Sequence, residues 1–201
     1  SSGGSSNTTT TPPAWSASVS DVLTFGNSYT SANGLSSMLE ELLRSAHSPS
    51  NTSDYTTGGH SISDHWDDVN TSGSPQNLSL ASGVWDTVLL QDQSQTPGLN
   101  RTTSQWLEGK NGSIHLAERI DAEGGATMLF MTWGRRSGDS TLTTLYPNYT
   151  VMQNRIEQGY IDYRDNISLS TSAEVYIAPV GLAFKHIHDS IVGSGGNPLD
   201  S

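Results

Sequence analysis

The sequence predicts an α/β fold, a three-layer α/β/α sandwich built on a five-stranded parallel sheet. Two observations predict it. Short apolar runs alternate with stretches of helical periodicity five times along the chain, a pattern typical of parallel strands joined by right-handed crossovers. The clearest of these runs is apolar throughout, as are strands that are buried on both faces of a sheet. The length of 201 residues suits one domain with a substantial core.

Five segments are expected as strands. The first apolar run ends at Gly26 and is interpreted as a buried strand, whereas the second, which precedes Gly58 and Gly59, is weaker. The expected ranges are 22–25, 55–57, 84–90, 126–132 and 175–180. Because ligands of such sheets bind beyond the carboxyl ends of the strands, the loops after these ranges are where a site is expected.

Five helices are expected between and after these strands, over residues 35–43, 62–69, 106–122, 149–167 and 182–191. An interruption of the third is expected near Gly112, because glycine is a poor helix former. The spacing of apolar residues gives two of the helices a clear inner face. In the first helix this face carries Leu35, Met38, Leu39, Leu42 and Leu43, and in the fourth it carries Met152, Ile156, Tyr160 and Tyr163.

The chain divides into a leader and a domain. Eleven of the first twenty residues are Ser or Thr, and a run of threonines leads into Pro12 and Pro13. Residues 1–20 are therefore interpreted as an extended, O-glycosylated leader or linker. Residues 21–201 are expected to form the folded domain.

The composition excludes several classes of function. Nine Lys and Arg stand against twenty Asp and Glu, which gives a net charge of −11. Without a basic patch, neither nucleic acid nor an anionic membrane surface is an expected partner. No apolar run approaches the ~18 residues that cross a bilayer. The chain has no cysteine, so disulfides, thiolate metal sites and a cysteine nucleophile are excluded.

Eight Asn-x-Ser/Thr sequons favour a glycosylated, secreted protein with an extracellular location. They begin at Asn7, Asn51, Asn70, Asn77, Asn100, Asn111, Asn148 and Asn166. The competing explanation is chance, since a chain rich in Ser, Thr and Asn creates sequons freely. The chain starts without Met, so a signal peptide is expected to have been removed already.

The loop after the first predicted strand carries a candidate nucleophile. Ser28 lies in a tight turn between a strand and a helix, where its side chain would project at the edge of the sheet. The alternative is that Ser28 or Thr30 only caps the helix. After the second strand, Gly58 and Gly59 would let the backbone approach a ligand closely, or would simply form a turn.

Polar side chains in the second and third loops add candidate acid–base and donor groups. His60 and His65 are candidate bases by position, although isolated histidines are more often surface or hydrogen-bonded residues. Gln91, Gln93 and Gln95 follow the third strand. Their amide groups could donate hydrogen bonds to an oxyanion.

Five segments, taken in order, resemble the SGNH (GDSL-type) hydrolase superfamily. The likeness is greatest to a branch with Gly-Asn-Ser-Tyr-Thr in place of the Gly-Asp-Ser motif, and it spans about residues 21–190. The segments are Gly26–Thr30, Gly58–Trp66, Leu90–Ser94, Thr132–Gly134 and Ala178–Ala183. The resemblance implies a flavodoxin-like sheet of the SGNH type and a serine esterase that needs no cofactor and no metal.

The resemblance also implies roles for individual residues. Ser28 would be the nucleophile, and the N–H groups of Ser28 and Gly59 would form the oxyanion hole together with a side-chain amide. The usual Asn is replaced by Gln, and Gln91, Gln93 or Gln95 could take its place.

The chain departs from the family pattern at the catalytic base. The superfamily carries its His in an Asp-x-x-His segment before the last helix, and the chain has no such segment. His186 and His188 follow the fifth strand too closely for this role, and their i, i+2 spacing on a helix does not suit a metal site. Because a serine without a base is a poor nucleophile, we expect a missing C-terminal segment, or a second chain, to supply the histidine and to cover part of the sheet.

Two functional hypotheses follow. The first is a secreted esterase that acts on ester or O-acetyl groups, with acetylated glycans as the substrates that the family suggests. The second is an inactive glycoprotein of the same fold that serves as a carbohydrate-binding or extracellular structural module, with Trp66, Trp85, Trp106 and Trp133 available to stack on sugars. A nucleotide-binding domain would share the sheet but needs a GxGxxG or GxxxxGK loop, which the sequence lacks.

Overall fold

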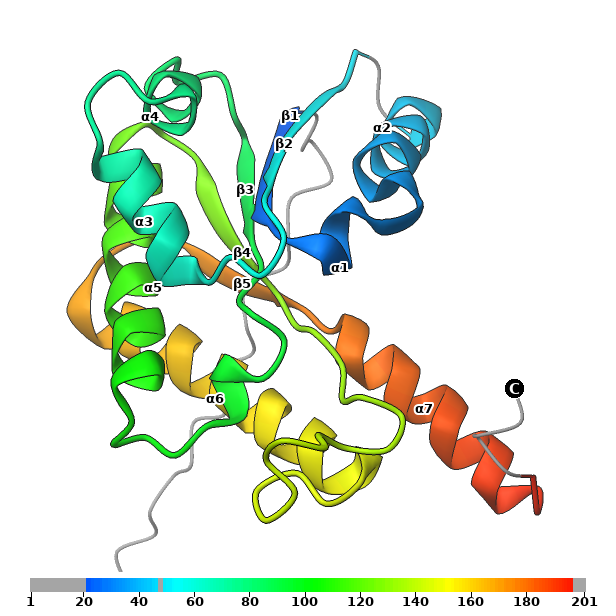
Figure 1. Ribbon diagram of the computed structural model, residues 1–201. Helices are drawn as coiled ribbons and strands as arrows, with labels where there is room; N and C mark the ends of the chain where they lie inside the picture. The colour runs from blue at the N-terminus through cyan, green and yellow to red at the C-terminus, as the bar shows by residue number, and fades with distance from the viewer. Residues whose placement is uncertain (1–20, 47–48, 197–201) are drawn as a thin grey trace, which may run out of the picture.

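The computed structural model of the chain describes residues 21–46 and 49–196. Within these residues, five parallel strands form one sheet in the order β2-β1-β3-β4-β5 (Figure 1). The strands are β1 (Asp21–Gly26), β2 (Asn51–Thr56), β3 (Thr87–Leu90), β4 (Ala126–Phe130) and β5 (Val175–Ala178). The predicted five-stranded parallel sheet with helical layers is confirmed.

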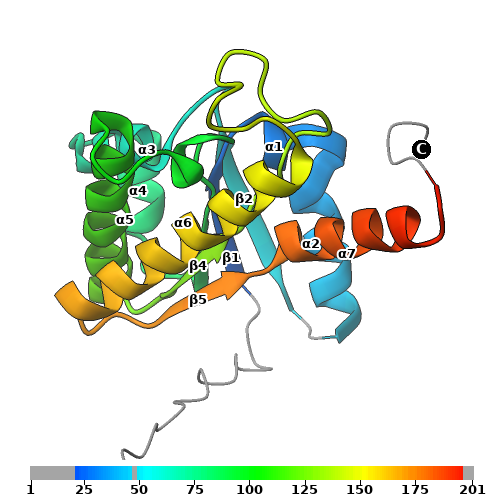
Figure 2. The same cartoon turned by 90° about the horizontal axis from the view of Figure 1, so that it is seen from below.

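Helices cover the two faces of the sheet unequally (Figures 1 and 2). One face carries α3 (Ile62–Asn70), α4 (Pro75–Leu80), α5 (Ser104–Ala122) and α6 (Tyr149–Ser170). The other face carries α1 (Ser28–Ser31) and α2 (Leu35–Ala46). The last helix, α7 (Val180–Gly193), leaves the end of β5 and extends away from the sheet (Figure 1).

The larger core lies between the sheet and the layer that contains α5 and α6. The predicted inner face of α6 is confirmed, since all four of its members are fully buried: Met152, Ile156, Tyr160 and Tyr163. Full burial of a large apolar side chain contributes about 1.5–3 kcal/mol. This face therefore fixes α6 against the sheet.

The interruption expected in α5 near Gly112 is wrong, because α5 is one continuous helix. Its glycines instead allow close packing on both sides. A Cβ at Gly112 would lie 3.0 Å from the Cα of Ser63 in α3, and a Cβ at Gly109 would lie 2.5 Å from the Oη of Tyr163 in α6. These tertiary contacts outweigh the low helix propensity of glycine, which costs about 1 kcal/mol per residue.

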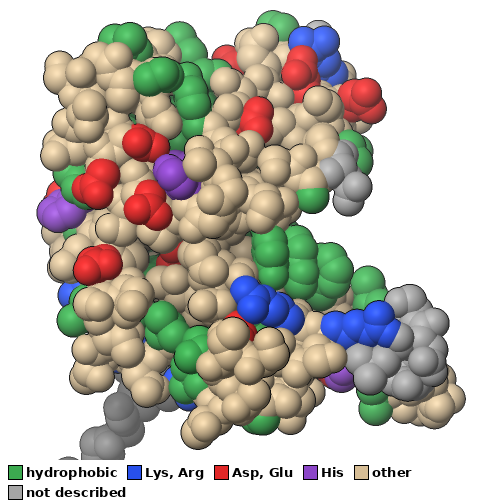
Figure 3. Space-filling model, viewed as in Figure 1, with side chains coloured by type: hydrophobic (Ala, Val, Ile, Leu, Met, Phe, Trp, Pro, Cys, Tyr) green, Lys and Arg blue, Asp and Glu red, His purple; other side chains and the backbone are tan. Residues whose placement is uncertain are grey.

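The opposite face of the sheet is partly open. Of the five apolar residues expected on the inner face of α2, only Leu43 is buried, while Met38 and Leu42 are 46% and 67% exposed. Met38 and Leu42 line an apolar groove of about 700 Å³ that continues over Met128 and Phe130 of β4. Figure 3 shows apolar side chains gathered in this hollow, between α2 and the start of α7.

Several element boundaries differ from the expected ones. β2 begins earlier than expected, at Asn51. Most of its residues are polar, but the strand pairs with β1 along its whole length. β3 begins only at Thr87, where its pairing with β1 and β4 starts. Helix α4 was not expected; Ser74 caps it and Pro75 occupies its first turn, a common way to start a helix. α7 begins at Val180, earlier than expected.

Two features are absent from residues 21–46 and 49–196. None of their helices is long and apolar enough to cross a membrane. Nor do their His, Asp and Glu side chains form a group of three or more that could hold a metal ion.

Candidate active site

The candidate site lies where the strand order reverses. The chain passes from β1 outward to β2 and then returns across β1 to β3, so β1 and β3 flank the switch point of the sheet. Loops that leave such a pair of strands diverge and open the crevice in which α/β proteins bind ligands. Ser28 follows β1 at this edge, and the loop that begins with Gln91 follows β3.

Asn27 builds the turn that presents Ser28. Asn27 is the N-cap of α1: its Oδ1 accepts from the N–H of Tyr29 at 3.1 Å, and its Nδ2 donates to the carbonyl oxygen of His60 at 2.8 Å. The alternative in which Ser28 or Thr30 caps the helix is therefore wrong. Ser28 is exposed, and its hydroxyl has no hydrogen-bond partner among the described residues, so that hydroxyl is free to react.

Gln91 supports this turn from inside the protein. Its buried Oε1 accepts from the N–H of Asn27 at 2.9 Å and from the hydroxyl of Thr30 at 3.2 Å. Its Nε2 donates to the carbonyl oxygen of Asp92. With both ends of its amide engaged and its side chain fully buried, Gln91 positions the nucleophile turn. Gly26 is required beside it, because a Cβ there would overlap the hydroxyl of Thr30.

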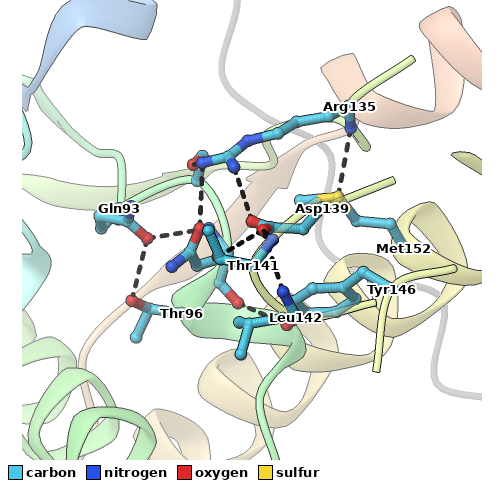
Figure 4. Close-up of polar contacts among 10 residues, drawn as sticks. Gln93, Thr96, Arg135, Asp139, Thr141, Leu142, Tyr146 and Met152 are labelled. Atoms are coloured by element: carbon cyan, nitrogen blue, oxygen red, sulfur yellow. Dashed lines mark hydrogen bonds and ion pairs between the residues drawn. The ribbon is translucent and has the colours of Figure 1, made fainter. Parts of the chain in front are cut away.

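The other sequence-predicted oxyanion donors are unpaired. The backbone N–H groups of Ser28 and Gly59 donate to no described residue, and Gly59 adopts a φ of +79°, a conformation that favours glycine. The Oε1 of Gln93 accepts from the N–H of Gln95 at 2.9 Å and from the hydroxyl of Thr96 at 3.3 Å (Figure 4). The Nε2 of Gln93 is thereby left free to donate to a developing negative charge.

The buried carboxylate of Asp92 joins the second loop to the third, and the sequence analysis missed it. Its Oδ1 accepts from the N–H of Ile62 at 2.9 Å and from that of Gln93 at 2.8 Å, and its Oδ2 accepts from the Oη of Tyr163 at 2.8 Å. Burial raises the pKa of Asp92 to about 6, although these hydrogen bonds act in the opposite direction. An acidic residue in the loop that follows a fully buried strand was the available signal.

His65 and His60 have partners other than Ser28. The Nε2 of His65 lies 2.9 Å from the carbonyl oxygen of Gly26, and because a carbonyl only accepts, this nitrogen carries the proton. Burial lowers the pKa of His65 to about 4, so the ring is neutral at physiological pH. The Nε2 of His60 lies 3.5 Å from a carboxylate oxygen of Asp68. His65 thus links α3 to β1, whereas the ring of His60 contacts α3.

The histidines of α5 and α7 also make contacts elsewhere. The ring of His188 stacks on Tyr149 with 4.2 Å between centroids, and its Nδ1 lies 3.1 Å from Asp189. The Nδ1 of His115 lies 3.5 Å from Glu118 on the same helix. Among the described residues, no histidine forms a hydrogen bond with the hydroxyl of Ser28.

Trp133 lies beside the candidate nucleophile turn. Its ring stacks on Tyr29 with 4.8 Å between centroids and on Phe184 of α7 with 4.4 Å. The stack links the residue after Ser28 to the loop after β4 and to α7. The other tryptophans considered for sugar binding pack in or against the larger core, namely Trp66, Trp85 and Trp106.

Comparison with known proteins identifies the fold. No protein-family model and no curated protein matches the chain. Among solved structures it is similar to a candidate SGNH hydrolase from Slackia heliotrinireducens, with 23% identity and a TM-score of 0.67 over 84% of this chain and 83% of that one. It is also similar to the acetyl xylan esterase AlAXEase, with 13% identity and a TM-score of 0.59 over 88% and 85% of the two chains. A third similar structure is the psychrotrophic esterase EstA from Pseudoalteromonas sp., with 12% identity and a TM-score of 0.51 over 78% and 76%. The chain therefore has the SGNH hydrolase fold.

Proposed function

We propose that the protein is a secreted serine esterase that cleaves ester or O-acetyl groups, with Ser28 as its nucleophile. The observation that carries this proposal is the exposed, unpartnered hydroxyl of Ser28 at the switch point of an SGNH-type sheet. Asn27 and Gln91 hold the turn without using that hydroxyl. Two of the similar structures are esterases, which supports the same class of reaction.

In the proposed reaction, a base removes the proton of Ser28 while its Oγ forms a bond to the ester carbonyl carbon. The carbonyl electron pair moves to oxygen, where the N–H groups of Ser28 and Gly59 and the Nε2 of Gln93 stabilise the negative charge. The bond to the alcohol oxygen then breaks as the base returns the proton to that oxygen. Water, activated by the same base, cleaves the acyl ester on Ser28 and restores the free serine.

The base is proposed to be a histidine from outside the described residues, in a further segment of this chain or in a second chain. His65 does not suit the role, because its Nε2 proton is donated to Gly26 and its pKa is lowered to about 4. None of the other described histidines forms a hydrogen bond with the hydroxyl of Ser28, and His115 and His188 lie beside Glu118 and Asp189 on α5 and α7.

The positions of the histidines also favour a second candidate function, an inactive carbohydrate-binding or structural module of the extracellular space. Without a base, a serine loses the concerted removal of its proton, and rates fall by orders of magnitude. A protein that kept the fold and lost the base would retain only the binding functions of its crevice.

Secretion is supported by the exposure of the sequons. Four sequon asparagines are exposed, and their Nδ2 atoms have no described partner: Asn70, Asn100, Asn111 and Asn148. In three others the Nδ2, the atom that would carry the glycan, donates a hydrogen bond: Asn51, Asn77 and Asn166. Asn7 lies outside the described residues. Glycopeptide mapping of protein from a eukaryotic secretory host should find glycan mainly on the first four, and a protein free of N-glycan would count against secretion.

Labelling of the natural, full-length protein with a fluorophosphonate probe tests the esterase proposal. We expect labelling that Ser28→Ala abolishes and that Ser31→Ala, an exposed serine of the same short helix, retains. Absence of labelling in folded natural protein would contradict the esterase and leave the binding module as the function.

A further inference from the structure

The loop after β4, residues 131–148, is organised around the buried carboxylate of Asp139 (Figure 4). The Oδ1 of Asp139 accepts from the N–H and the hydroxyl of Thr141 at 2.8 and 2.6 Å, and from the N–H of Leu142 at 3.2 Å. Its Oδ2 lies 2.6 Å from the guanidinium of Arg135. These bonds lie within the loop, so the loop has a defined shape of its own.

The backbone at Arg135 is anchored on α6. Its N–H donates to the Sδ of Met152 at 3.3 Å, and the N–H of Gly134 donates to the Oε1 of Gln153 at 2.8 Å. Met152 and Gln153 are both fully buried. The side chain of Arg135 therefore starts from a fixed point, and its ion pair with Asp139 fixes the direction of its guanidinium.

The guanidinium of Arg135 also reaches the loop after β3. Its Nη1 pairs with Asp139, whereas its Nη2 donates to the Oγ of Ser94 at 2.9 Å and to the Oε1 of Gln95 at 3.0 Å. A second contact joins the same two loops, because the Oη of the buried Tyr146 donates to the carbonyl oxygen of Gln95 at 2.7 Å. Gln95 is thus held through both its side chain and its backbone.

Gln95 in turn orients the amide of Gln93. The backbone N–H of Gln95 donates to the Oε1 of Gln93 at 2.9 Å, and the hydroxyl of Thr96 donates to the same oxygen at 3.3 Å. Because a backbone N–H can only donate, the amide must turn its oxygen toward Gln95 and its Nε2 away. This Nε2 is the candidate oxyanion donor. Gln93 also lines a polar pocket of about 560 Å³, to which Ser61 and the first turns of α5 contribute.

We propose that Arg135 is a positioning residue of the candidate active site and orients the Nε2 of Gln93 through Gln95. The oxyanion role of Gln93 rests on the proposed function, whereas the contacts that orient its amide do not. A donor stabilises a developing oxyanion best when it already points to the place where the charge forms, because no reorganisation is then needed during the reaction. A freely turning amide would also present its oxygen, which repels negative charge.

Arg135→Lys, with Arg136→Lys as its control, tests this role in the natural, full-length protein. A lysine at position 135 can still pair with Asp139, but its donors share one nitrogen and cannot also span both acceptors on the other loop. Arg136 is exposed, and its side chain forms no hydrogen bond or ion pair with a described residue. Urea unfolding checks that each variant is folded. If Arg135→Lys is not, Gln95→Met carries the test, because it removes the side-chain acceptor and keeps the ion pair.

Fluorophosphonate labelling of Ser28 measures the effect on the reaction. Arg135→Lys should lower the limiting labelling rate by at least about fivefold and leave the half-saturating probe concentration within about twofold, because the donor acts on charge that develops only in the transition state. In a Gln93→Ala background the same substitution should change the rate by less than about twofold, since the group through which it acts is gone. Arg136→Lys should have no effect in either background.

Amide hydrogen exchange at the N–H of Gln95 measures the same contacts without any reaction. This N–H is protected by its bond to Gln93. Its exchange should be at least about tenfold faster in Arg135→Lys than in wild type, because the loop opens more often. Arg136→Lys should exchange as wild type does.

The proposal is overturned if Arg135→Lys labels at the wild-type rate, if it slows labelling equally with and without Gln93, or if exchange at Gln95 is unchanged. Its failure is distinguishable from failure of the esterase. If Ser28 is labelled in none of these proteins, the esterase is contradicted, and exchange at Gln95 alone decides whether Arg135 orients Gln93. If the wild type is labelled and Arg135→Lys matches it, the esterase stands and the positioning role is lost.

Discussion

The Asp92→Asn substitution removes a buried charge while keeping a side chain of the same shape where the second and third loops meet. The Oδ1 of the new amide can still accept from the N–H groups of Ile62 and Gln93, and its Nδ2 can donate to the Oη of Tyr163. The packing and the hydrogen-bond geometry are therefore kept. The difference in stability between the two proteins isolates the titration of the Asp92 carboxyl group.

The magnitude follows from the raised pKa. Burial moves the pKa of Asp92 from 3.8 to about 6. Between these values the folded protein keeps a proton that the unfolded chain releases, so the contribution of this group is full below pH ~4 and is lost as the pH rises through ~6. At 1.36 kcal/mol per pKa unit, the loss is about 3 kcal/mol.

His65 acts in the opposite direction over nearly the same range. Burial lowers its pKa from 6.5 to about 4, so the unfolded chain binds a proton that the folded protein excludes. Its contribution of about 3 kcal/mol is present above pH ~6.5 and is lost as the pH falls through ~4. In the wild-type protein the two effects nearly cancel, and removal of either one should reveal the other.

Urea unfolding followed by tryptophan fluorescence, from about pH 4 to about pH 8, measures the free energy of unfolding of each protein. Relative to wild type, Asp92→Asn should gain about 3 kcal/mol of stability from the lower to the upper end of this range, and His65→Gln should lose a similar amount. The reasoning from the buried carboxyl group is refuted if the free energies of unfolding of wild type and Asp92→Asn differ by the same amount, within about 0.5 kcal/mol, across this pH range.

Five further substitutions test the packing and the candidate site. Gln91→Ala leaves the buried N–H of Asn27 unpaired and should cost about 1–3 kcal/mol of stability, whereas Gln93→Ala should mainly slow fluorophosphonate labelling, by about tenfold or more; equal effects in both assays would contradict the separate roles. Gly112→Ala should cost about 1–3 kcal/mol in urea unfolding, because the new methyl group would press on the α3 backbone; wild-type stability would argue against close packing there. Leu42→Ala should cost under about 1 kcal/mol and Ile120→Ala about 2–5 kcal/mol, since Leu42 is 67% exposed and Ile120 is fully buried; similar costs would mean that the apolar groove is covered in solution.

The parts of the fold that the sequence predicted well are those set by local patterns. The inner face of α6 repeats with the helical period, and β1 and β4 are short apolar runs, so each pattern lies within its own element. β2 is different, because its polar residues Asn51–Thr56 form a strand only through pairing with β1, which is distant in the sequence. Gly112 is a similar case: its position inside a helix depends on contact with α3, and that contact cannot be read from helix propensity.

In the candidate site, the motifs located the loops but not the bonding within them. Ser28 was placed correctly at the end of β1, yet the assignment of its neighbour Asn27 as the cap required the conformation of the turn. Gln91 and Gln93 have the same chemistry and neighbouring positions. Their different roles arise because one points into the protein beneath the turn and the other into the pocket, a difference in side-chain direction that composition does not encode.

The candidate site can keep its geometry while the carboxyl group of Asp92, which joins its loops, takes up or releases a proton. Its Oδ1 alone binds the backbone N–H groups of Ile62 and Gln93, which belong to the two loops that flank the pocket. When the carboxyl group takes up a proton, the proton can occupy Oδ2, because the hydroxyl of Tyr163 can change from donor to acceptor. The bonds to both loops then persist in either charge state. The pH therefore changes the stability of the protein through Asp92, while the arrangement of Gly59, Gln93 and the pocket lining stays the same.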